Sequence, residues 1–374
     1  TAATAVTAAT AVTAATAATA AMAPTGAGER VNARPAPAEP GVEQRIAARQ
    51  ERVHILTGPT CNNNCTFCME EDREGRVVTN SATTDEVVQK ILAENRGCEE
   101  VCFTSGEPTV NPRLAQWVKW AKDAQVRRIS MMTNGRTLSY EKYARILIGA
   151  GMNRFYVSIH GHTAKLHESL TRTPGSYEQT VGGLEMVTRF KRYGLELHTS
   201  TVVTRQNLPN LAEIYRFLRS KGVDQVVFNV MQANGRANTH FDVLFPRYSE
   251  IAAAAKAFLD EQGKHEARVQ AFFVDIPLCA TTSLPDFNRG YVESYVHYEP
   301  LASGARLLGQ DEVAARAEGG QIVGVKRSDL DDAQRTKRPE CSSCRYDSTC
   351  EGVWKNYLKR YGWDELVPVP PTQG

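Results

Sequence analysis

The sequence has little net charge, because 44 Lys and Arg residues are balanced by 42 Asp and Glu residues among 374, which leaves a formal charge of +2. It also lacks a long basic run, and only Lys337 and Arg338, close to three C-terminal cysteines, form a small local group. A protein that binds nucleic acid usually carries a basic stripe or face. We therefore expect no nucleic acid among the partners.

Long, strongly apolar runs are also missing. Residues 1–21 contain only Thr, Ala and Val, in a loose TAATAV repeat, and these residues are too weakly apolar to favour a membrane-spanning helix. No charged-then-apolar secretory signal is visible. We expect no membrane association and a cytoplasmic location. Residues 1–50, which turn rich in Pro, Gly and Ala after residue 21, are expected to form a low-complexity, flexible N-terminal arm.

A disulfide framework is not expected, because the nine cysteines are an odd number. Seven of them fall at spacings or positions that suit metal ligands, which favours a reduced compartment and metal-binding thiolates. The remaining two, Cys98 and Cys102, lie in or beside a β-branched run. Free cysteine is among the most buried residue types, so core packing is the expectation for both.

Short β-branched runs recur along the chain, beginning near residues 52, 99, 127, 154, 196 and 225, with amphipathic stretches between them. Strand and helix alternating at a spacing of roughly 30 residues is typical of βαβ units and a parallel sheet. The six units predict an α/β fold with a partial barrel or an open sheet over residues 51–235. Residues 236–374 break the pattern and are expected to form a C-terminal extension.

Chemically distinctive residues follow the predicted strands. Ligands gather at the carboxyl ends of parallel strands, so we expect these residues to meet at one mouth of the barrel. They are Cys61, Cys65, Cys68, Ser105–Pro108, Thr133–Gly135, Ser158, His160, Thr201 and Met231.

The stretch CNNNCTFC holds three cysteines, Cys61, Cys65 and Cys68. Iron–sulfur clusters usually take four thiolates, so three thiolates on a four-iron cube leave one iron open to an amine and a carboxylate. This C-x3-C-x2-C pattern, with an aromatic residue, Phe67, before the last cysteine, resembles the signature of radical S-adenosylmethionine (radical SAM) enzymes.

The resemblance continues over residues 52–235. Ser105–Pro108 (SGEP) resembles the family's glycine–glutamate motif, and Thr133–Gly135 (TNG) and Val157–Gly161 (VSIHG) fall where relatives carry similar strand ends. It implies a partial (β/α)6 TIM-like barrel and a 4Fe–4S cluster that cleaves SAM to methionine and a 5′-deoxyadenosyl radical. That radical abstracts hydrogen from the substrate. Reduced flavodoxin or ferredoxin is implied as the electron donor.

The resemblance also assigns roles to residues. Glu107 would accept a hydrogen bond from the methionine amino group, and Gly106 would let the backbone approach the ligand. Phe67 would lie near the adenine, while Ser158 and Asn134 would contact the ribose or the carboxylate, or merely cap strand ends. The other expected SAM contacts are Ser105, Pro108, Thr133, Thr201 and Met231.

His160 follows the fourth predicted strand, where many relatives carry an acidic residue before the glycine. A histidine at a barrel mouth can act as an acid or base near neutral pH. It can equally be a hydrogen-bonded structural histidine, and the sequence leaves both interpretations open.

A second group, C-x2-C-x5-C, comprises Cys341, Cys344 and Cys350. Zinc is one alternative for such spacing. The pattern also resembles the SPASM domain of radical SAM enzymes, but it is truncated, because Trp354 stands where that domain continues with cysteine. Cys279 is the plausible fourth ligand downstream of the barrel, so a shortened, twitch-like extension with one auxiliary 4Fe–4S cluster is expected. In the rival interpretation Cys279 is the hydrogen donor of a radical epimerase.

These features predict a radical SAM oxidoreductase or isomerase. The first hypothesis is oxidation or epimerisation of a small biosynthetic substrate such as a sugar, nucleoside or amino acid derivative. The second is modification of a ribosomally made peptide or a protein side chain. A molybdopterin-type cyclase, whose C-terminal cysteine spacing is longer, and an iron–sulfur carrier or sensor without turnover are further alternatives. The Glu107 motif argues against the carrier.

Overall fold

The structure is a computed structural model of the 374-residue chain. It describes residues 7–8, 52–68, 84–231, 235–263, 269–284, 312–316, 322–326, 335–348, 350 and 352–371. The N-terminal arm expected for residues 1–50 therefore lies outside the described residues, apart from strand β1 (Thr7–Ala8), which pairs with β9 (Glu312–Arg316).

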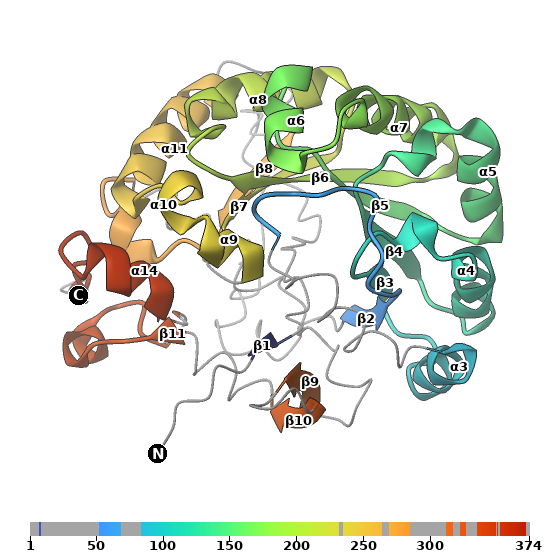
Figure 1. The fold of residues 1–374 in the computed structure, drawn as a ribbon, viewed down its shortest axis with the longest axis horizontal. Helices are drawn as coiled ribbons and strands as arrows, with labels where there is room; N and C mark the ends of the chain where they lie inside the picture. Colours follow the sequence, from blue (N-terminus) through green and yellow to red (C-terminus); the bar gives the residue numbers. More distant parts are fainter. Residues whose placement is uncertain are drawn as a thin grey trace, which may run out of the picture.

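The central feature is a sheet of seven parallel strands that follow one another in sequence order. They are β2 (Arg52–Leu56), β3 (Glu100–Thr104), β4 (Arg128–Thr133), β5 (Arg154–Ser158), β6 (Glu196–Val203), β7 (Gln225–Val230) and β8 (Gln270–Val274). The sheet curls into an open half-barrel, with helices in an arc on its outer face (Figure 1). The predicted α/β partial barrel is confirmed.

The helices cover the sheet with one apolar face each. In α8 (Leu211–Ser220) the buried residues are Leu211, Ile214, Tyr215 and Leu218, the i, i+3, i+4, i+7 spacing of an amphipathic helix. The other helices of the arc are α3 (Asp85–Glu94), α4 (Leu114–Asp123), α5 (Glu141–Ala150), α6 (Ala164–Thr171), α7 (Ser176–Phe190) and α11 (Tyr248–Gly263).

The sheet carries one strand more than the six that the sequence predicts. Strand β8 starts at Gln270 whereas β7 starts at Gln225, so this unit, like the first one from β2 to β3, is longer than the predicted spacing. Helices α9 (Gly235–Thr239), α10 (Phe241–Leu244) and α11 all lie between the two strands. The regular spacing is lost there, which is why β8 was assigned to the extension beyond residue 235.

Ionic side chains close the base of the half-barrel. Glu100 on β3 bonds Arg52 and Arg154, each at 3.1 Å, and Tyr156 donates to Glu100 at 3.1 Å. All four residues are buried, and removing one partner from such a network leaves an uncompensated charge. Tyr156 also lines the cavity at the carboxyl ends of the strands, which is described in the next section. The network therefore supports the floor of that cavity.

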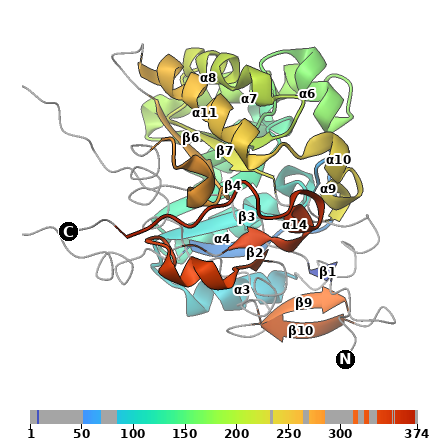
Figure 2. The ribbon, with the colours of Figure 1, turned by 90° about the vertical axis from the view of Figure 1, so that its left-hand side faces the viewer.

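The C-terminal extension packs beside α10 and α11, at the end of the arc remote from α3 (Figures 1 and 2). Its β11 (Arg335–Thr336) and β12 (Val353–Trp354) form an antiparallel pair, followed by α14 (Lys355–Tyr361). The rings of Tyr357 and Tyr248 lie 4.1 Å apart, and the Tyr357 hydroxyl accepts from the Tyr248 amide at 3.0 Å. Aromatic packing thus holds the extension on the barrel.

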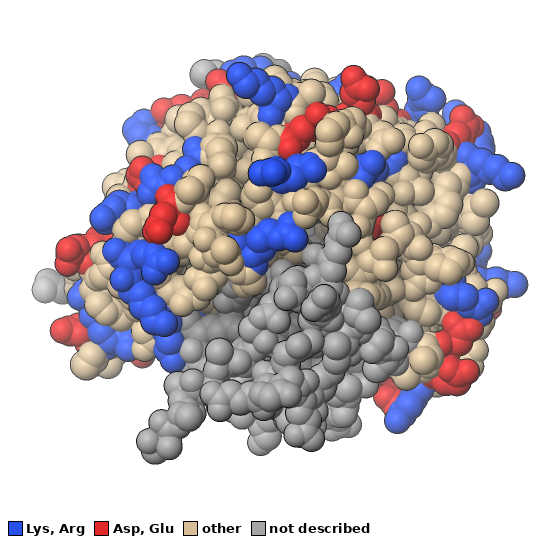
Figure 3. Space-filling view, viewed as in Figure 1, with Lys and Arg blue, Asp and Glu red and all other residues tan. Residues whose placement is uncertain are grey.

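Two surface observations bear on the expected partners. None of the helices in the described part of the chain is both long and apolar enough to cross a membrane. On the face drawn in Figure 3, Lys and Arg are interspersed with Asp and Glu around the rim. This distribution agrees with the near-zero net charge.

Candidate active site

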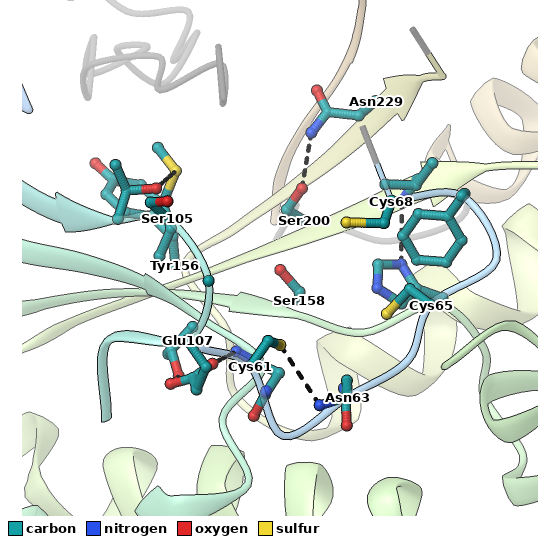
Figure 4. Close-up of a pocket in the computed structure, with 18 of the residues that line it drawn as sticks. Cys61, Asn63, Cys65, Cys68, Ser105, Glu107, Tyr156, Ser158, Ser200 and Asn229 are labelled. Carbon is teal, nitrogen blue, oxygen red and sulfur yellow. Dashed lines mark hydrogen bonds between the residues drawn. The ribbon is translucent and has the colours of Figure 1, made fainter. Parts of the chain in front are cut away.

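A cavity of about 200 Å³ opens at the carboxyl ends of the strands; we call it the mouth cavity. Figure 4 shows Cys65 and Cys68 on one side of it and Ser105 and Tyr156 on the other, with Ser158 and Ser200 between them. The structure brings most of the predicted site residues to this cavity. They are Cys61, Cys65, Phe67, Cys68, Ser105, Gly106, Glu107, Thr133, Asn134, Ser158, His160 and Met231.

The three cysteines lie on the segment that follows β2, residues 57–68, which we call the cluster loop. This loop forms no helix or strand. Its backbone is instead held by the end of α6: the Asn64 amide donates to the Thr171 carbonyl at 3.0 Å, and the Thr66 amide donates to the Leu170 carbonyl at 2.9 Å. The loop path therefore depends on contacts from elsewhere in the fold.

The three asparagines between Cys61 and Cys65 have a shared role, because each side-chain oxygen accepts a hydrogen bond from a different residue. The pairs are Asn62 with Asn134 at 2.5 Å, Asn63 with Arg136 at 3.0 Å, and Asn64 with Arg236 at 2.5 Å. Sequence reasoning missed this, although the NNN run itself is an unusual polar signal.

The cysteine chemistry fits an iron–sulfur cube. Among the described residues, no three or more His, Cys, Asp or Glu side chains are placed to hold a single metal ion, but a four-iron cube is larger and keeps its thiolates further apart. The Cys61 sulfur accepts from the Asn63 amide at 3.4 Å. Burial, and then the thiolates of Cys68 and Cys61, raise the pKa of Cys65, so the three thiols are close enough to interact.

Glu107 is held at the mouth by four hydrogen bonds. One carboxylate oxygen accepts from the amide and hydroxyl of Thr109 and from the Thr133 hydroxyl, and the other accepts from the Asn134 amide at 2.7 Å. The second oxygen thus keeps room for a further donor, such as an amino group. Burial raises the pKa of Glu107 above its usual value although these donors oppose the shift.

The turn before Glu107 has an unusual backbone. Ser105 and Gly106 have φ angles of 73° and 54°, and a Cβ on Gly106 would lie 2.4 Å from the Thr60 carbonyl oxygen. The Glu107 amide donates to the same carbonyl at 2.8 Å. Glycine is therefore required where this turn meets the cluster loop.

Two predicted SAM contacts do not line the mouth cavity. Thr201 donates its hydroxyl to the Ile159 carbonyl at 2.5 Å, while its neighbours Ser200 and Val202 line the cavity. Side chains alternate along a strand, so the Thr201 side chain points away from the cavity that its two neighbours line. Pro108, which begins the short 3₁₀-helix η1 (Pro108–Val110), is also outside the lining.

His160 lies in the cavity wall as a buried, hydrogen-bonded ring. Burial, with a contribution from His167, holds the pKa of His160 well below its usual value. Its Nδ1 accepts from the Val202 amide at 3.2 Å, which places the proton of the neutral ring on Nε2. The ring packs edge-on against Phe67, with centroids 4.5 Å apart.

Further polar residues in the lining were not predicted, among them Ser200, Asn229 and Asp275. The Asn229 amide nitrogen donates to the Ser200 hydroxyl at 2.8 Å, and the Asn229 oxygen has no hydrogen-bond partner among the described residues. Asp275, at the end of β8, has a φ of 62° and pairs with Arg335 of the extension at 2.8 Å. Asp275 was missed because β8 was missed.

The other four candidate ligands meet in a second, smaller cavity of about 30 Å³, the auxiliary cavity. Cys279 comes from the 3₁₀-helix η5 (Leu278–Thr281) after β8, whereas the extension supplies Cys341, Cys344 and Cys350. Burial, followed by the thiolates of those three cysteines, raises the pKa of Cys279 to about 12. Cys279 is absent from the described lining of the mouth cavity.

Backbone amides point at two sulfurs of the auxiliary cavity. The Gly352 amide donates to Cys350 at 3.3 Å, and the Val369 amide donates to Cys344 at 3.4 Å. Trp363, Leu366 and Pro368 are among the apolar residues of the wall, which also includes Lys337 and Asp347. Amide–sulfur hydrogen bonds and an apolar shell are features that tune iron–sulfur clusters, so this donor set also fits such a cluster.

Comparison with known proteins agrees with this geometry. Residues 55–234 match the family model described as "Radical SAM superfamily". The "AdoMet-dependent heme synthase" of Oleidesulfovibrio alaskensis is 26% identical over 178 residues, 48% of this chain and 45% of the relative. The "Probable GTP 3',8-cyclase" of Sulfurisphaera tokodaii is 28% identical over 224 residues, 60% of this chain and 68% of the relative. The chain thus spans about half the length of the heme synthase it matches.

Solved structures share the fold at low identity. Streptococcus suis SuiB bound to S-adenosylmethionine superposes with a TM-score of 0.58 at 16% identity, covering 87% of this chain and 76% of SuiB. Native anSMEcpe with bound AdoMet gives a TM-score of 0.51 at 15% identity, covering 82% of this chain and 90% of anSMEcpe. The cysteine loop at the mouth of the half-barrel lies within residues 55–234, and the match over these residues identifies a radical SAM domain in this chain.

Proposed function

We propose that the chain uses a cluster on the cluster loop together with one auxiliary 4Fe–4S cluster to oxidise or epimerise a small biosynthetic substrate. The observation that carries the auxiliary cluster is the meeting of Cys279 with Cys341, Cys344 and Cys350 in one cavity, although Cys279 comes from a separate part of the chain. Four thiolates are the usual ligand set of a 4Fe–4S cluster.

At the mouth, Cys61, Cys65 and Cys68 would hold the first cluster and leave one iron for SAM. When bound, the cluster and SAM supply the one-electron cleavage that generates the hydrogen-abstracting radical. Glu107 accepts the amino group of SAM on its second oxygen, and Phe67 packs near the adenine. Reduced flavodoxin or ferredoxin is the expected electron donor.

The wall of the mouth cavity that is remote from Glu107 favours a substrate that carries hydrogen-bond donors. Asn229 lines this cavity, and its side-chain oxygen, which has no hydrogen-bond partner among the described residues, offers an acceptor there. Within the described lining, neither Lys nor Arg occurs, whereas phosphate recognition commonly uses such cations. Hydroxyl or amino groups of a sugar, nucleoside or amino acid derivative match this wall.

The position of Cys279 bears on the choice between oxidation and epimerisation. Its thiol lines the auxiliary cavity, which supports the role of a fourth ligand over that of a hydrogen donor at the mouth. A fully ligated auxiliary cluster suits acceptance of a substrate electron, so oxidation is the first candidate. Modification of a peptide side chain remains the alternative.

The test is anaerobic reconstitution of the full chain, followed by iron and sulfide counts with Mössbauer spectra. Wild type should bind about eight irons, and Cys279→Ala or Cys341→Ala should bind about four. The matched control is Cys98→Ala, which alters a cysteine outside both cavities and should leave the iron count unchanged. About four irons in the wild type, with zinc bound in addition, would contradict the auxiliary cluster and turn the search to epimerisation.

A further inference from the structure

Two arginines from different elements contact the cluster loop. Arg136 follows β4, immediately after the TNG stretch, and its guanidinium bonds the Asn62 carbonyl and, at 3.0 Å, the Asn63 side chain. Arg236 in α9, which follows β7, reaches the same loop. Its Nη1 lies 3.1 Å from the Cys65 carbonyl and 3.3 Å from the Asn64 carbonyl.

These contacts are directed at backbone carbonyls that stand among the cysteine ligands. Carbonyl oxygens turned toward an anionic thiolate–iron cluster raise its electrostatic energy, whereas a guanidinium bound to them offsets this with a charge-assisted hydrogen bond. The Cys65 carbonyl belongs to one of the ligands itself. The charge of Arg236 therefore lies very near the first cluster.

Arg136 and Arg236 together form a clamp on the cluster loop, and the Arg136 side chain of this clamp is itself fixed in place. Arg136 donates from Nε to Gln179 on α7 at 2.6 Å, so its fork cannot turn freely. Asn134 joins the same network, because its side chain bonds Asn62 and its amide bonds Glu107. The loop that carries the cysteines and the carboxylate proposed to bind SAM are thus connected through Asn62 and Asn134.

We propose that Arg136 and Arg236 are positioning residues that hold the cluster loop in the ligand arrangement and favour the reduced form of its cluster. This inference rests on the proposed cluster at Cys61, Cys65 and Cys68. Positive charge beside a cluster raises its reduction potential, since net charge and hydrogen bonds set that potential. Because Arg236 bonds a ligand's own carbonyl, its effect on the potential exceeds that of Arg136.

The decisive experiment is an EPR-monitored redox titration of the reconstituted full-length chain. Only a cluster with an open iron changes its signal when SAM is added, so the signal is assigned without altering the auxiliary cysteines. We expect Arg236→Gln to make reduction about tenfold less favourable, about 59 mV for a one-electron couple. Arg236→Lys keeps the charge and should stay within about threefold of wild type while retaining less iron.

The matched control is Arg189→Gln, which removes an exposed arginine near the end of α7 and should leave the potential and the iron content unchanged. An unchanged potential in Arg236→Gln would overturn the electrostatic role. A potential equally lowered in Arg236→Lys would overturn the assignment to charge. A wild type without any SAM-responsive cluster would defeat the proposed function itself, which separates the two failures.

Hydrogen exchange on the iron-free chain covers the case in which Arg236→Gln binds no iron. Amides of residues 57–68 should exchange at least about tenfold faster in Arg136→Gln and Arg236→Gln than in wild type, because the loop loses its clamp before any cluster forms. Arg189→Gln should exchange as wild type does. Equal loop exchange in all four proteins would overturn the clamp.

Discussion

Cys61, Cys65 and Cys68 lie within one stretch of eight residues, whereas the four cysteines of the auxiliary cavity come from two separate segments, η5 and the extension. The first set depends on one loop and on the side chains that hold it. The second set exists only when the extension docks beside β8.

The surroundings of the two sites differ as well. The mouth cavity presents a carboxylate, Glu107, with room for a further donor, which suits an exchangeable ligand on an open iron. The auxiliary cavity instead presents four cysteines beside the apolar residues Trp363, Leu366 and Pro368, which suits a fully ligated cluster. Open sites serve chemistry and closed sites serve structure or electron transfer.

The largest expected effect is the loss of reductive SAM cleavage when the cysteines at the mouth are replaced, which replacement of an auxiliary cysteine should not cause. Replacing Cys61, Cys65 and Cys68 together by Ala should abolish reductive SAM cleavage, because no open iron remains. Replacing Cys344 by Ala should leave SAM cleavage in place, since its sulfur lies in the auxiliary cavity. The measurement is 5′-deoxyadenosine formation with dithionite. Equal loss in both variants would contradict the division of roles.

A smaller effect should follow from Glu107→Gln, which should weaken SAM binding about 10- to 100-fold, the range of a hydrogen bond to a charged group. Burial raises the pKa of Glu107 above 4.5. Only the ionised carboxylate pairs with the SAM ammonium, so affinity should fall as the pH falls through that pKa. Calorimetric affinities between about pH 5 and pH 8 should show this fall in wild type but not in Glu107→Gln. Matching pH profiles would contradict the assigned role.

Two glycine-to-alanine substitutions, one at each site, allow the same kind of backbone change to be compared at the mouth cavity and at the auxiliary cavity. A Cβ would lie 2.4 Å from the Thr60 oxygen in Gly106→Ala and 2.6 Å from the Thr336 oxygen in Gly352→Ala, and both positions have positive φ, 54° and 93°. Each change should cost about 1–3 kcal/mol locally. We expect the first to weaken SAM binding and the second to reduce auxiliary iron, measured by calorimetry and iron counts. Gly149→Ala, at a helical position with open space, is the control that should affect neither.

The smallest expected effect concerns the hydrogen bond from the Val369 amide to the Cys344 sulfur, 3.4 Å. Val369→Pro removes this donor and should make the auxiliary cluster harder to reduce, whereas Val369→Ala keeps the N–H and should not. The readout is the midpoint potential of the signal that does not respond to SAM. Equal potentials in the two variants would show that the hydrogen bond does not tune the cluster.

Local patterns in the sequence were sufficient for the parallel half-barrel and for the residues at its mouth. β-Branched runs mark strands, and the cysteine loop and the Glu107 turn are short segments that directly follow them. Such features depend on neighbouring residues, which is why spacing alone could predict them. The family resemblance then supplied chemistry that spacing does not contain.

The tertiary structure decided what depends on distant contacts. Thr201 and Ser200 point to opposite faces of the sheet, because a shift of one residue along a strand reverses the side chain's direction, and only sheet packing places Ser200 rather than Thr201 at the cavity. β8, and with it Asp275, follows a connection that holds three helices, α9, α10 and α11, so the simple alternation of strand and helix is lost there. The clamp by Arg136 and Arg236, and the meeting of Cys279 with the extension, join segments whose separation in sequence carries no local signal. Only packing of the whole chain brings such segments together.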